Sequence, residues 1–188
     1  MIPAGRVSGE GSGIAIERYH YSEEPDIAAF VPRPAPADPG LPPVVYAIDR
    51  ERAPHYWFPR DCPRVIYAKG ERTSEADRRA LFGDTAASKV IAVENGWLER
   101  IRETKLYVYT FAGDSFRLLD GTAGYYVSEE TVVPLRVEPV GDLLAKLLAE
   151  PLELRFMPCL HRLRDTVVAS TADFSIIRFR NASPRIGC

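Results

Sequence analysis

The chain has 188 residues, of which 46% are hydrophobic and 27% charged, and its formal net charge is −2. A chain of this length suits one compact domain that buries roughly 70% of its unfolded surface. The near-neutral charge argues against DNA or RNA as the main partner, and no segment approaches the ~20 apolar residues that a membrane-spanning helix needs.

Cysteine usage and the N-terminal segment indicate the compartment. The three cysteines, Cys62, Cys159 and Cys188, form no CxxC pair, which predicts reduced thiols without a structural zinc site. Residues 1–13 are rich in Gly and Ser and lack the apolar run of a signal peptide. We therefore expect a flexible tail over residues 1–13 and a cytoplasmic protein with a single domain over residues 14–188.

The first half of the domain alternates short apolar runs with helix and turn signals. Residues 14–21 have strand character, and Ser22 as N-cap with Pro25 in the first turn then favours a short helix within residues 22–30. Six prolines in residues 31–43 fix φ and remove backbone donors, so this segment should be an extended surface loop. Further strands are expected over residues 44–48, 64–68 and 89–94, and helices over residues 50–58, 73–83 and 95–103.

The second half predicts more strands, two of them in a hairpin about Asp120-Gly121 that joins residues 116–120 to residues 122–130. Two prolines restrict residues 131–140 to an edge or irregular strand. The pattern also predicts strands over residues 105–112 and 152–158 and helices over residues 141–150, 161–170 and 171–182, although IIRF at 176–179 would also suit a strand. Together these elements predict an α+β fold with a mixed, mostly antiparallel sheet as its core and short flanking helices.

The stretch VVYAIDRERAPHYWFPRDCPRVIY, residues 44–67, concentrates aromatic, arginine and proline residues. In its PRDCPR motif, Asp61 lies between Arg60 and Arg64, so two interpretations are open. An ion-pair network would make the turn rigid, or the arginine forks would bind an anion such as phosphate. Cys62 in the same motif is expected to be a small buried thiol, because no base that would activate it is identifiable.

Two further candidates lie at expected strand ends. His20 in RYHYSEE is either a structural hydrogen-bonding residue or a ligand-binding or acid–base group at the lip of a cleft. Glu129 and Glu130 follow two tyrosines in GYYVSEETVVP; both can be solvated, or one of them faces a cleft and polarises a hydroxyl. No metal site, hydrolase nucleophile elbow or Gly-rich phosphate loop is expected, because HxxxH, CxxC, G-x-S-x-G and related spacings are missing from the sequence.

The chain resembles a family of uncharacterised bacterial proteins, a domain of unknown function, over residues from about Ile16 to Ala182. That family implies no established activity. The segments that carry the resemblance are RYHYSEEPDIAAFVPRP, AIDRERAPHYWFPRDCPRV, LERIRETKLYVY, GYYVSEETVVPL and VVASTADFSIIRFRNA.

A more distant resemblance is to the ADP-ribosyltransferase fold, which uses NAD and in one large branch carries a His-Tyr-Glu constellation on three separated strands. By this resemblance the histidine would hydrogen-bond the adenosine ribose, two aromatic rings would flank the nicotinamide, and one glutamate would hold the 2′-hydroxyl of the other ribose. Loss of nicotinamide develops oxocarbenium character, which a carboxylate and a π-face stabilise. The matching residues are, in chain order, His20, Tyr46, Tyr56 or Trp57, and Glu129 or Glu130.

The leading hypothesis is thus an NAD-binding, ADP-ribosyltransferase-like enzyme of the glycosyltransferase class. In it, His20 and either Glu130 or Glu129 are catalytic, and Arg60 and Arg64 lie near the phosphates of a nucleotide. The alternative is a non-enzymatic module that binds a small molecule or a protein and uses the same residues as a packed aromatic core with a rigid turn. A nucleotide-processing enzyme of another mechanism would keep the arginine–phosphate contacts without using a glutamate.

Overall fold

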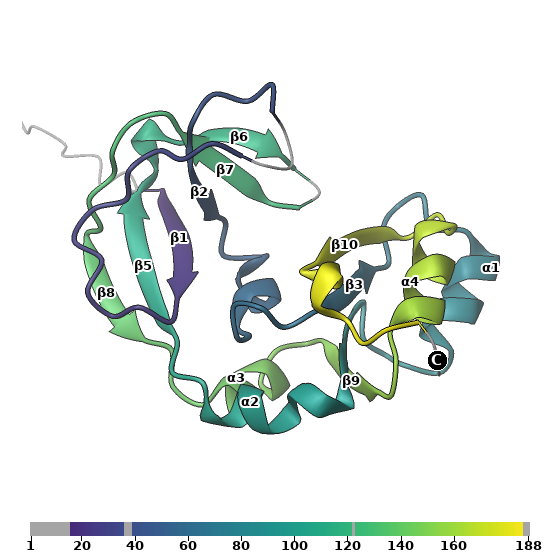
Figure 1. Cartoon of the computed structure of the whole chain (residues 1–188). Coiled ribbons are helices and arrows are strands. Elements are labelled where there is room, and N and C mark those ends of the chain that lie inside the picture. The colour runs from purple at the N-terminus through teal and green to yellow at the C-terminus, as the bar shows by residue number, and fades with distance from the viewer. Residues whose placement is uncertain (1–15, 36–38, 122, 186–188) are drawn as a thin grey trace, which may run out of the picture.

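The computed structural model describes residues 16–35, 39–121 and 123–185, so the tail expected over residues 1–13 lies outside the described residues. Two β-sheets with short helices around them make up the described part (Figure 1). This confirms the α+β class and the largely antiparallel pairing that the sequence predicts.

The six-stranded sheet, on the left of Figure 1, has the order β6-β7-β2-β1-β5-β8, and all of its pairs are antiparallel. β6 and β7 form the hairpin expected about Asp120-Gly121. The strands of this sheet are β1 (Glu17–Ser22), β2 (Val45–Ile48), β5 (Tyr107–Ala112), β6 (Arg117–Asp120), β7 (Tyr125–Ser128) and β8 (Arg136–Pro139).

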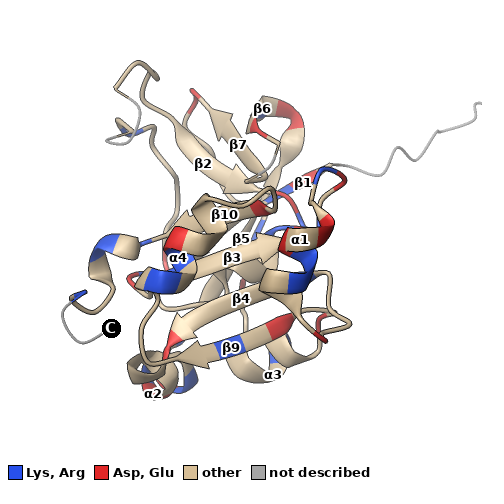
Figure 2. Cartoon of the chain, turned by 90° about the vertical axis from the view of Figure 1, so that its right-hand side faces the viewer, with Lys and Arg blue, Asp and Glu red and all other residues tan. Residues whose placement is uncertain are grey.

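The four-stranded sheet has the order β10-β3-β4-β9, with β4 and β9 parallel and the other pairs antiparallel. Figure 2 shows these strands side by side, with α1 and α4 on their outer face. The strands are β3 (Arg64–Ala68), β4 (Lys89–Glu94), β9 (Glu153–Met157) and β10 (Asp173–Ile177).

The helices are short, and none of those in the described ranges has the length and apolar character needed to cross a bilayer. The α-helices are α1 (Glu75–Asp77), α2 (Leu98–Glu103), α3 (Leu143–Leu148) and α4 (His161–Val168). Tighter 3-10 turns are η1 (Ala53–Tyr56), η3 (Asn95–Trp97), η4 (Gly113–Ser115) and η5 (Phe179–Asn181), and η2 (Arg78–Phe82) is a π-helical turn.

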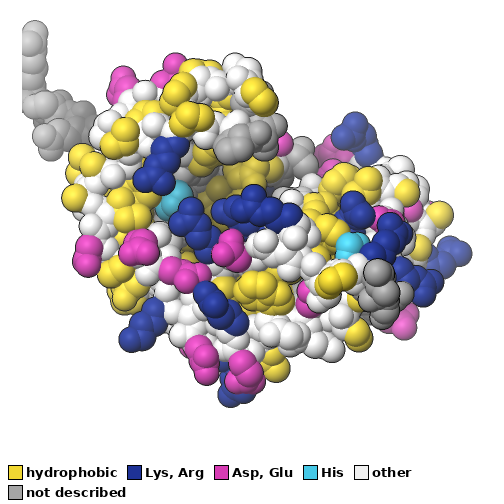
Figure 3. Space-filling model, in the orientation of Figure 1, with side chains coloured by type: hydrophobic (Ala, Val, Ile, Leu, Met, Phe, Trp, Pro, Cys, Tyr) yellow, Lys and Arg dark blue, Asp and Glu magenta, His cyan; other side chains and the backbone are white. Residues whose placement is uncertain are grey.

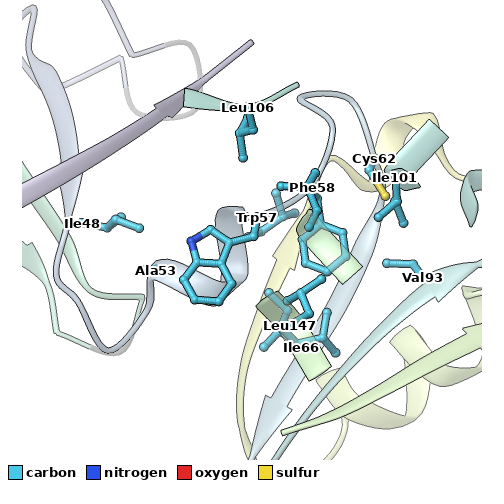
Figure 4. Packing of buried hydrophobic residues seen from close by; sticks show 13 residues of the cluster. Ile48, Ala53, Trp57, Phe58, Cys62, Ile66, Val93, Ile101, Leu106 and Leu147 are labelled. Atoms are coloured by element: carbon cyan, nitrogen blue, oxygen red, sulfur yellow. The ribbon is translucent and has the colours of Figure 1, made fainter. Parts of the chain in front are cut away.

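The main hydrophobic core lies between the two sheets (Figure 4). Trp57 and Phe58, directly after η1, are 5% and 2% exposed and fill its centre. Ile66 of β3 and Val93 of β4 pack against them from the four-stranded sheet, and Leu147 of α3 also contributes. Full burial of one large apolar side chain contributes about 1.5–3 kcal/mol, so this layer stabilises the packing of the two sheets against each other.

Residues 23–30 do not form the helix that the sequence predicts. The Ser22 hydroxyl accepts a hydrogen bond from the Glu24 amide at 3.1 Å and closes a local turn instead of capping a helix. Phe30 then pairs with Val132 through an isolated β-bridge. The segment is therefore extended, because contacts with the rest of the sheet override its local helix signals.

The buried Tyr109 of β5 holds this extended segment in place. Its hydroxyl donates a hydrogen bond to the Glu24 carbonyl and accepts one from the Ile27 amide at 3.1 Å. One phenol thereby replaces the intrahelical partners that these backbone groups would have had.

Two other expected helices also differ in the structure. Within residues 171–182, Asp173–Ile177 forms β10 instead of a helix, because it pairs along all of β3 at the edge of the four-stranded sheet; the strand alternative for residues 176–179 is confirmed at Ile176 and Ile177. Within residues 73–83, the helix is reduced to α1 and the π-helical turn Arg78–Phe82. Of the cysteines, Cys62 is the buried free thiol that the sequence predicts, whereas Cys159 is disulfide-bonded, contrary to the expectation of reduced thiols.

His55 of η1 is a buried polar residue in an otherwise apolar layer. It is 5% exposed, and burial lowers its pKa to about 3, with the positive charges of Lys89 and Arg64 contributing. An unfolded histidine has a pKa of ~6.5. The unfolded chain therefore binds the extra proton first as the pH falls, and stability is lost between about pH 6.5 and about pH 3.

We predict that replacing Tyr109 with Phe lowers the free energy of unfolding by about 1–3 kcal/mol, because it leaves the Glu24 carbonyl and the Ile27 amide without their partner. Urea denaturation measures this change. Tyr107→Phe on the same strand is the control, since its ring is only partly buried against the core. Equal stability of the two variants would contradict the role assigned to the Tyr109 hydroxyl.

We also predict that His55 makes the free energy of unfolding fall by up to ~1.4 kcal/mol per pH unit between about pH 6.5 and 5, above the main range of carboxylate titration. His55→Gln, which cannot titrate, should show a shallower slope in urea denaturation across this range. Parallel curves for the wild type and the variant would show that His55 is not neutral in the fold.

Candidate functional site

Two adjoining cavities lie beside β1 and between the sheets, and we call them together the cleft. They share His20, Ser22, Arg60 and Arg178 among their lining residues. Figure 3 shows the hollow between the two parts of the molecule, with Lys and Arg side chains gathered across it. The strand-split cavity, of about 520 Å³, is also lined by Ile27, Phe30, Arg33, Val44, Val45 and Tyr46, and the inter-sheet cavity, of about 460 Å³, by Tyr21, Tyr56, Phe58, Arg64, Tyr125 and Ile177.

The strand-split cavity arises because β1 and β2 separate soon after they meet. Their register contains one facing pair, Tyr19 with Ile48, whereas β1 pairs with β5 along its whole length. Beyond that pair the His20 ring lies between the two strands, with its Nδ1 at 3.0 Å from the Tyr46 carbonyl oxygen. Phe30 packs against the ring with a centroid distance of 4.8 Å. A side chain thus takes the place of the next backbone pairing.

The contact with Tyr46 determines the tautomer of His20. A carbonyl oxygen only accepts hydrogen bonds, so Nδ1 carries the proton and the lone pair of a neutral ring is on Nε2. Burial lowers the pKa of His20, and the charges of Arg60 and Arg33 lower it further. His20 is therefore a neutral imidazole whose Nε2 is suited to accept a hydrogen bond from a ligand hydroxyl.

The cleft is lined by arginines that form no ion pair among the described residues and by two carboxylates, those of Glu23 and Glu24. Arg33, Arg60 and Arg178 take part in none of the ion pairs found within the described ranges. Glu23, which also lines the inter-sheet cavity, accepts a hydrogen bond from the Arg60 backbone amide at 2.8 Å and lies 3.8 Å from Arg100. Like charges that converge on one hollow favour the binding of an anion there.

Arg64 brings a further cation to the inter-sheet cavity. It is 3% exposed and donates hydrogen bonds to the His55 carbonyl at 2.6 Å and the Cys62 carbonyl at 2.7 Å. Burial lowers its pKa to about 10, so it remains charged at neutral pH. The Asp61 ion pair considered for the PRDCPR turn is not formed: Asp61 is exposed, and these carbonyl contacts of Arg64 make the turn rigid instead.

A group of tyrosines forms the aromatic wall of the cleft. Tyr125 of β7 lies 5.9 Å from Tyr46 and 6.3 Å from Tyr56, measured between ring centroids, and so connects the two. Burial raises the pKa of Tyr56, which keeps its phenol protonated. Of the two alternatives for the second aromatic residue, Tyr56 lines the inter-sheet cavity, whereas Trp57 belongs to the hydrophobic core.

The two glutamates lie at the edge of this arrangement. Glu129 and Glu130 are exposed, are not among the lining residues of the cleft, and follow β7 directly. Glu129 forms an ion pair with Arg117 at 3.2 Å. Glu130 lies between Ser128, which pairs with a residue of β2, and Val132, which pairs with a residue of the 23–30 segment. The His-Tyr-Glu candidates therefore fall on the adjacent strands β1, β2 and β7, with the glutamates just beyond the last of them.

Neither thiol nor metal chemistry is indicated for the cleft. Cys62 is fully buried, and burial raises the pKa of its thiol to about 12, so it is protonated at neutral pH. Across the described ranges, no three His, Cys, Asp or Glu side chains gather in a way that could hold a metal ion.

Three residues of the cleft were missed by sequence reasoning: Arg33, Tyr125 and Arg178. Arg33 lies in the proline-rich segment and pairs through its backbone with Val44. Tyr125 is the first tyrosine of GYYVSEE. Adjacent residues of a strand point to opposite faces of the sheet, so the pair Tyr125 and Tyr126 could have indicated one tyrosine on each face. Arg178 has φ 53° and ψ 26°, the left-handed conformation that non-glycine residues seldom adopt, and no sequence signal marks it.

We predict that Arg178→Gly keeps or increases the free energy of unfolding, by at most ~1 kcal/mol, because glycine adopts a positive φ without strain. The control is Arg180→Gly, two residues further along in η5, where φ is not positive and glycine should destabilise by about 0.5–1 kcal/mol. Urea denaturation compares the two. A loss of stability in Arg178→Gly as large as that in the control would show that the strain is not relieved.

Comparison with known proteins gives one match. No curated protein and no solved structure matches the chain significantly. A family of unknown function, DUF6886, matches residues 19–182. This range includes both sheets except the first two residues of β1, and all residues of the cleft named above. The chain therefore belongs to DUF6886, a family of unknown function.

Proposed function

We propose that the cleft binds a nucleotide and that the protein is an ADP-ribosyltransferase-like enzyme whose substrate is NAD. The observation that carries the proposal is the neutral His20, with Nε2 as an acceptor, beside Arg33, Arg60 and Arg178, whose guanidinium groups form none of the ion pairs in the described part of the chain. A hydroxyl donor next to anionic groups is the combination that a ribose phosphate presents.

Each part of the cleft suits one part of such a ligand. His20 Nε2 would accept a hydrogen bond from a ribose hydroxyl, as the likeness to the His-Tyr-Glu branch implies. Arg60 and Arg178, at the junction of the two cavities, would hold the phosphates through charge-assisted hydrogen bonds. The tyrosine wall, with Tyr56 over the charge of Arg64 at 5.7 Å, offers a flat surface for an aromatic ring.

The chemistry proposed is transfer of an ADP-ribosyl group, in which the bond between nicotinamide and its ribose breaks and a nucleophile of the acceptor bonds to the same ribose carbon. NAD supplies the leaving group, and the protein's part is to orient the ribose and stabilise positive charge on it. Glu130 or Glu129 would hold the 2′-hydroxyl of that ribose. The acidic side chain would have to reach inward from the end of β7 when a ligand is bound.

The exposed position of both glutamates favours a second candidate, a module that binds a nucleotide without transforming it. In that case the arginines and His20 bind the ligand and the carboxylates stay in solvent. The two candidates share the binding site and differ in the need for Glu129 or Glu130, so a glutamate variant separates them.

We predict that isothermal titration calorimetry detects NAD binding and that His20→Ala weakens it about 3- to 10-fold, the effect of one hydrogen bond. His161→Ala is the control, because this histidine lies on α4 and contacts the Ser183 carbonyl away from the cleft. If no heat of binding is detected at millimolar NAD, or if the His20 variant binds NAD as tightly as the wild type, the proposed nucleotide site is wrong.

The catalytic part has its own test, release of nicotinamide measured by chromatography. We expect Glu130→Ala or Glu129→Ala to reduce the rate at least ~100-fold while NAD still binds, since a carboxylate that stabilises a developing charge is worth several kcal/mol. Binding without any release in the wild type would favour the non-enzymatic module.

A further inference from the structure

Apart from the cleft, the protein has another cavity of about 360 Å³, which we call the second cavity. It shares none of the lining residues of the cleft. It is bounded by the segment from β2 to η1, the turn between β6 and β7, and the ends of β3, β4 and β10. Its volume is within the range of small-molecule sites. His55, Ser88 and Lys89 are among its lining residues.

Lys89 reaches this cavity from the first position of β4. The alternation of β4 places its stem on the same face as Ile91 and Val93, which are buried in the core between the sheets. Its ammonium has one long contact, to the Glu51 carbonyl at 3.4 Å, and takes part in none of the ion pairs of the described residues. Partial burial of an ammonium group that has no direct ion pair disfavours its charged form.

The surroundings of Lys89 disfavour its charge in two ways. Burial lowers the pKa of its ammonium and is the largest effect; the negative charges of Glu51, Asp49 and Glu150 act in the opposite direction, and the positive charge of Arg52 lowers the pKa further. His55 beside it stays neutral, and its buried Nε2 has no partner within the described part of the chain. His55 is only 5% exposed. A ligand in this cavity could supply the hydrogen bond that its Nε2 lacks.

We propose that this cavity is a second ligand site, in which the Lys89 amine forms an imine with a small aldehyde or ketone. The amine lone pair bonds to the carbonyl carbon while the π electrons of the C=O bond move to oxygen. A proton passes from nitrogen to that oxygen, and loss of water leaves the C=N bond. The step is reversible and consumes neither oxidant nor reductant.

The site is independent of the nucleotide proposal, and its test uses the full chain with pyridoxal 5′-phosphate as the carbonyl probe. Borohydride reduction fixes any imine, and peptide mass mapping distinguishes the four lysines, Lys69, Lys89, Lys105 and Lys146. At pH 7 we expect Lys89 to be labelled at least ~3-fold faster than Lys105, which is exposed, although Lys89 is less accessible.

Two variants keep the test decisive. Lys89→Arg should remove the fast labelling and leave that of Lys105 unchanged. Ser88→Phe, at an exposed position on the cavity wall, should block entry and slow labelling of Lys89 at least ~3-fold without affecting Lys105. Labelling of Lys89 no faster than that of Lys105, or unaffected by Ser88→Phe, would overturn the proposal.

Discussion

The separation of β1 from β2 is the constraint on which the cleft depends. The register of β1 and β2 contains one facing pair, Tyr19 with Ile48. Next to it, the Nδ1–H of His20 donates a hydrogen bond to the Tyr46 carbonyl, so an imidazole ring connects the two strands where they separate. The same bond orients Nε2, so one interaction both preserves the sheet and prepares a hydrogen-bond acceptor.

The electrostatic character of the cleft follows from what surrounds that gap. Arg64 is committed to two backbone carbonyls and remains charged despite its burial, while Arg60 and Arg178 approach from separate loops. Keeping such charges together costs free energy in the free protein, and a bound anion relieves that cost. Arg178 adds backbone strain of its own, which is common where a side chain is held for binding.

Local sequence patterns predicted most strands and the hairpin of β6 and β7, since apolar alternation and turn residues act over a few neighbours. They failed for residues 22–30, where Ser22 and Pro25 mimic a helix start but Tyr109, more than eighty residues away, holds the chain extended. At β10 they favoured a helix and left a strand open only for residues 176–179, because the partner strand β3 is far along the chain. The local periodicity of apolar residues does not determine which strands become neighbours in a sheet.

The same limit applies to the site. His20, Tyr46, Arg60 and Arg64 were identifiable because they lie in unusual local sequence, and the structure brings them all to the cleft. Arg33, Tyr125 and Arg178 were not, because their importance arises from segments that meet only in the fold. Trp57 shows the converse, since this aromatic residue, next to Tyr56 in the sequence, lies in the hydrophobic core and does not line the cleft.

The short η1 turn forms part of the wall of both the cleft and the second cavity. His55 borders the second cavity, Tyr56 borders the cleft, and the Arg64 bond to the His55 carbonyl ties the turn to β3. A ligand on one side that displaces this turn therefore changes the shape offered on the other. By thermodynamic reciprocity, each ligand would then alter the affinity of the other by the same factor, and the two cavities would communicate through a single turn of backbone.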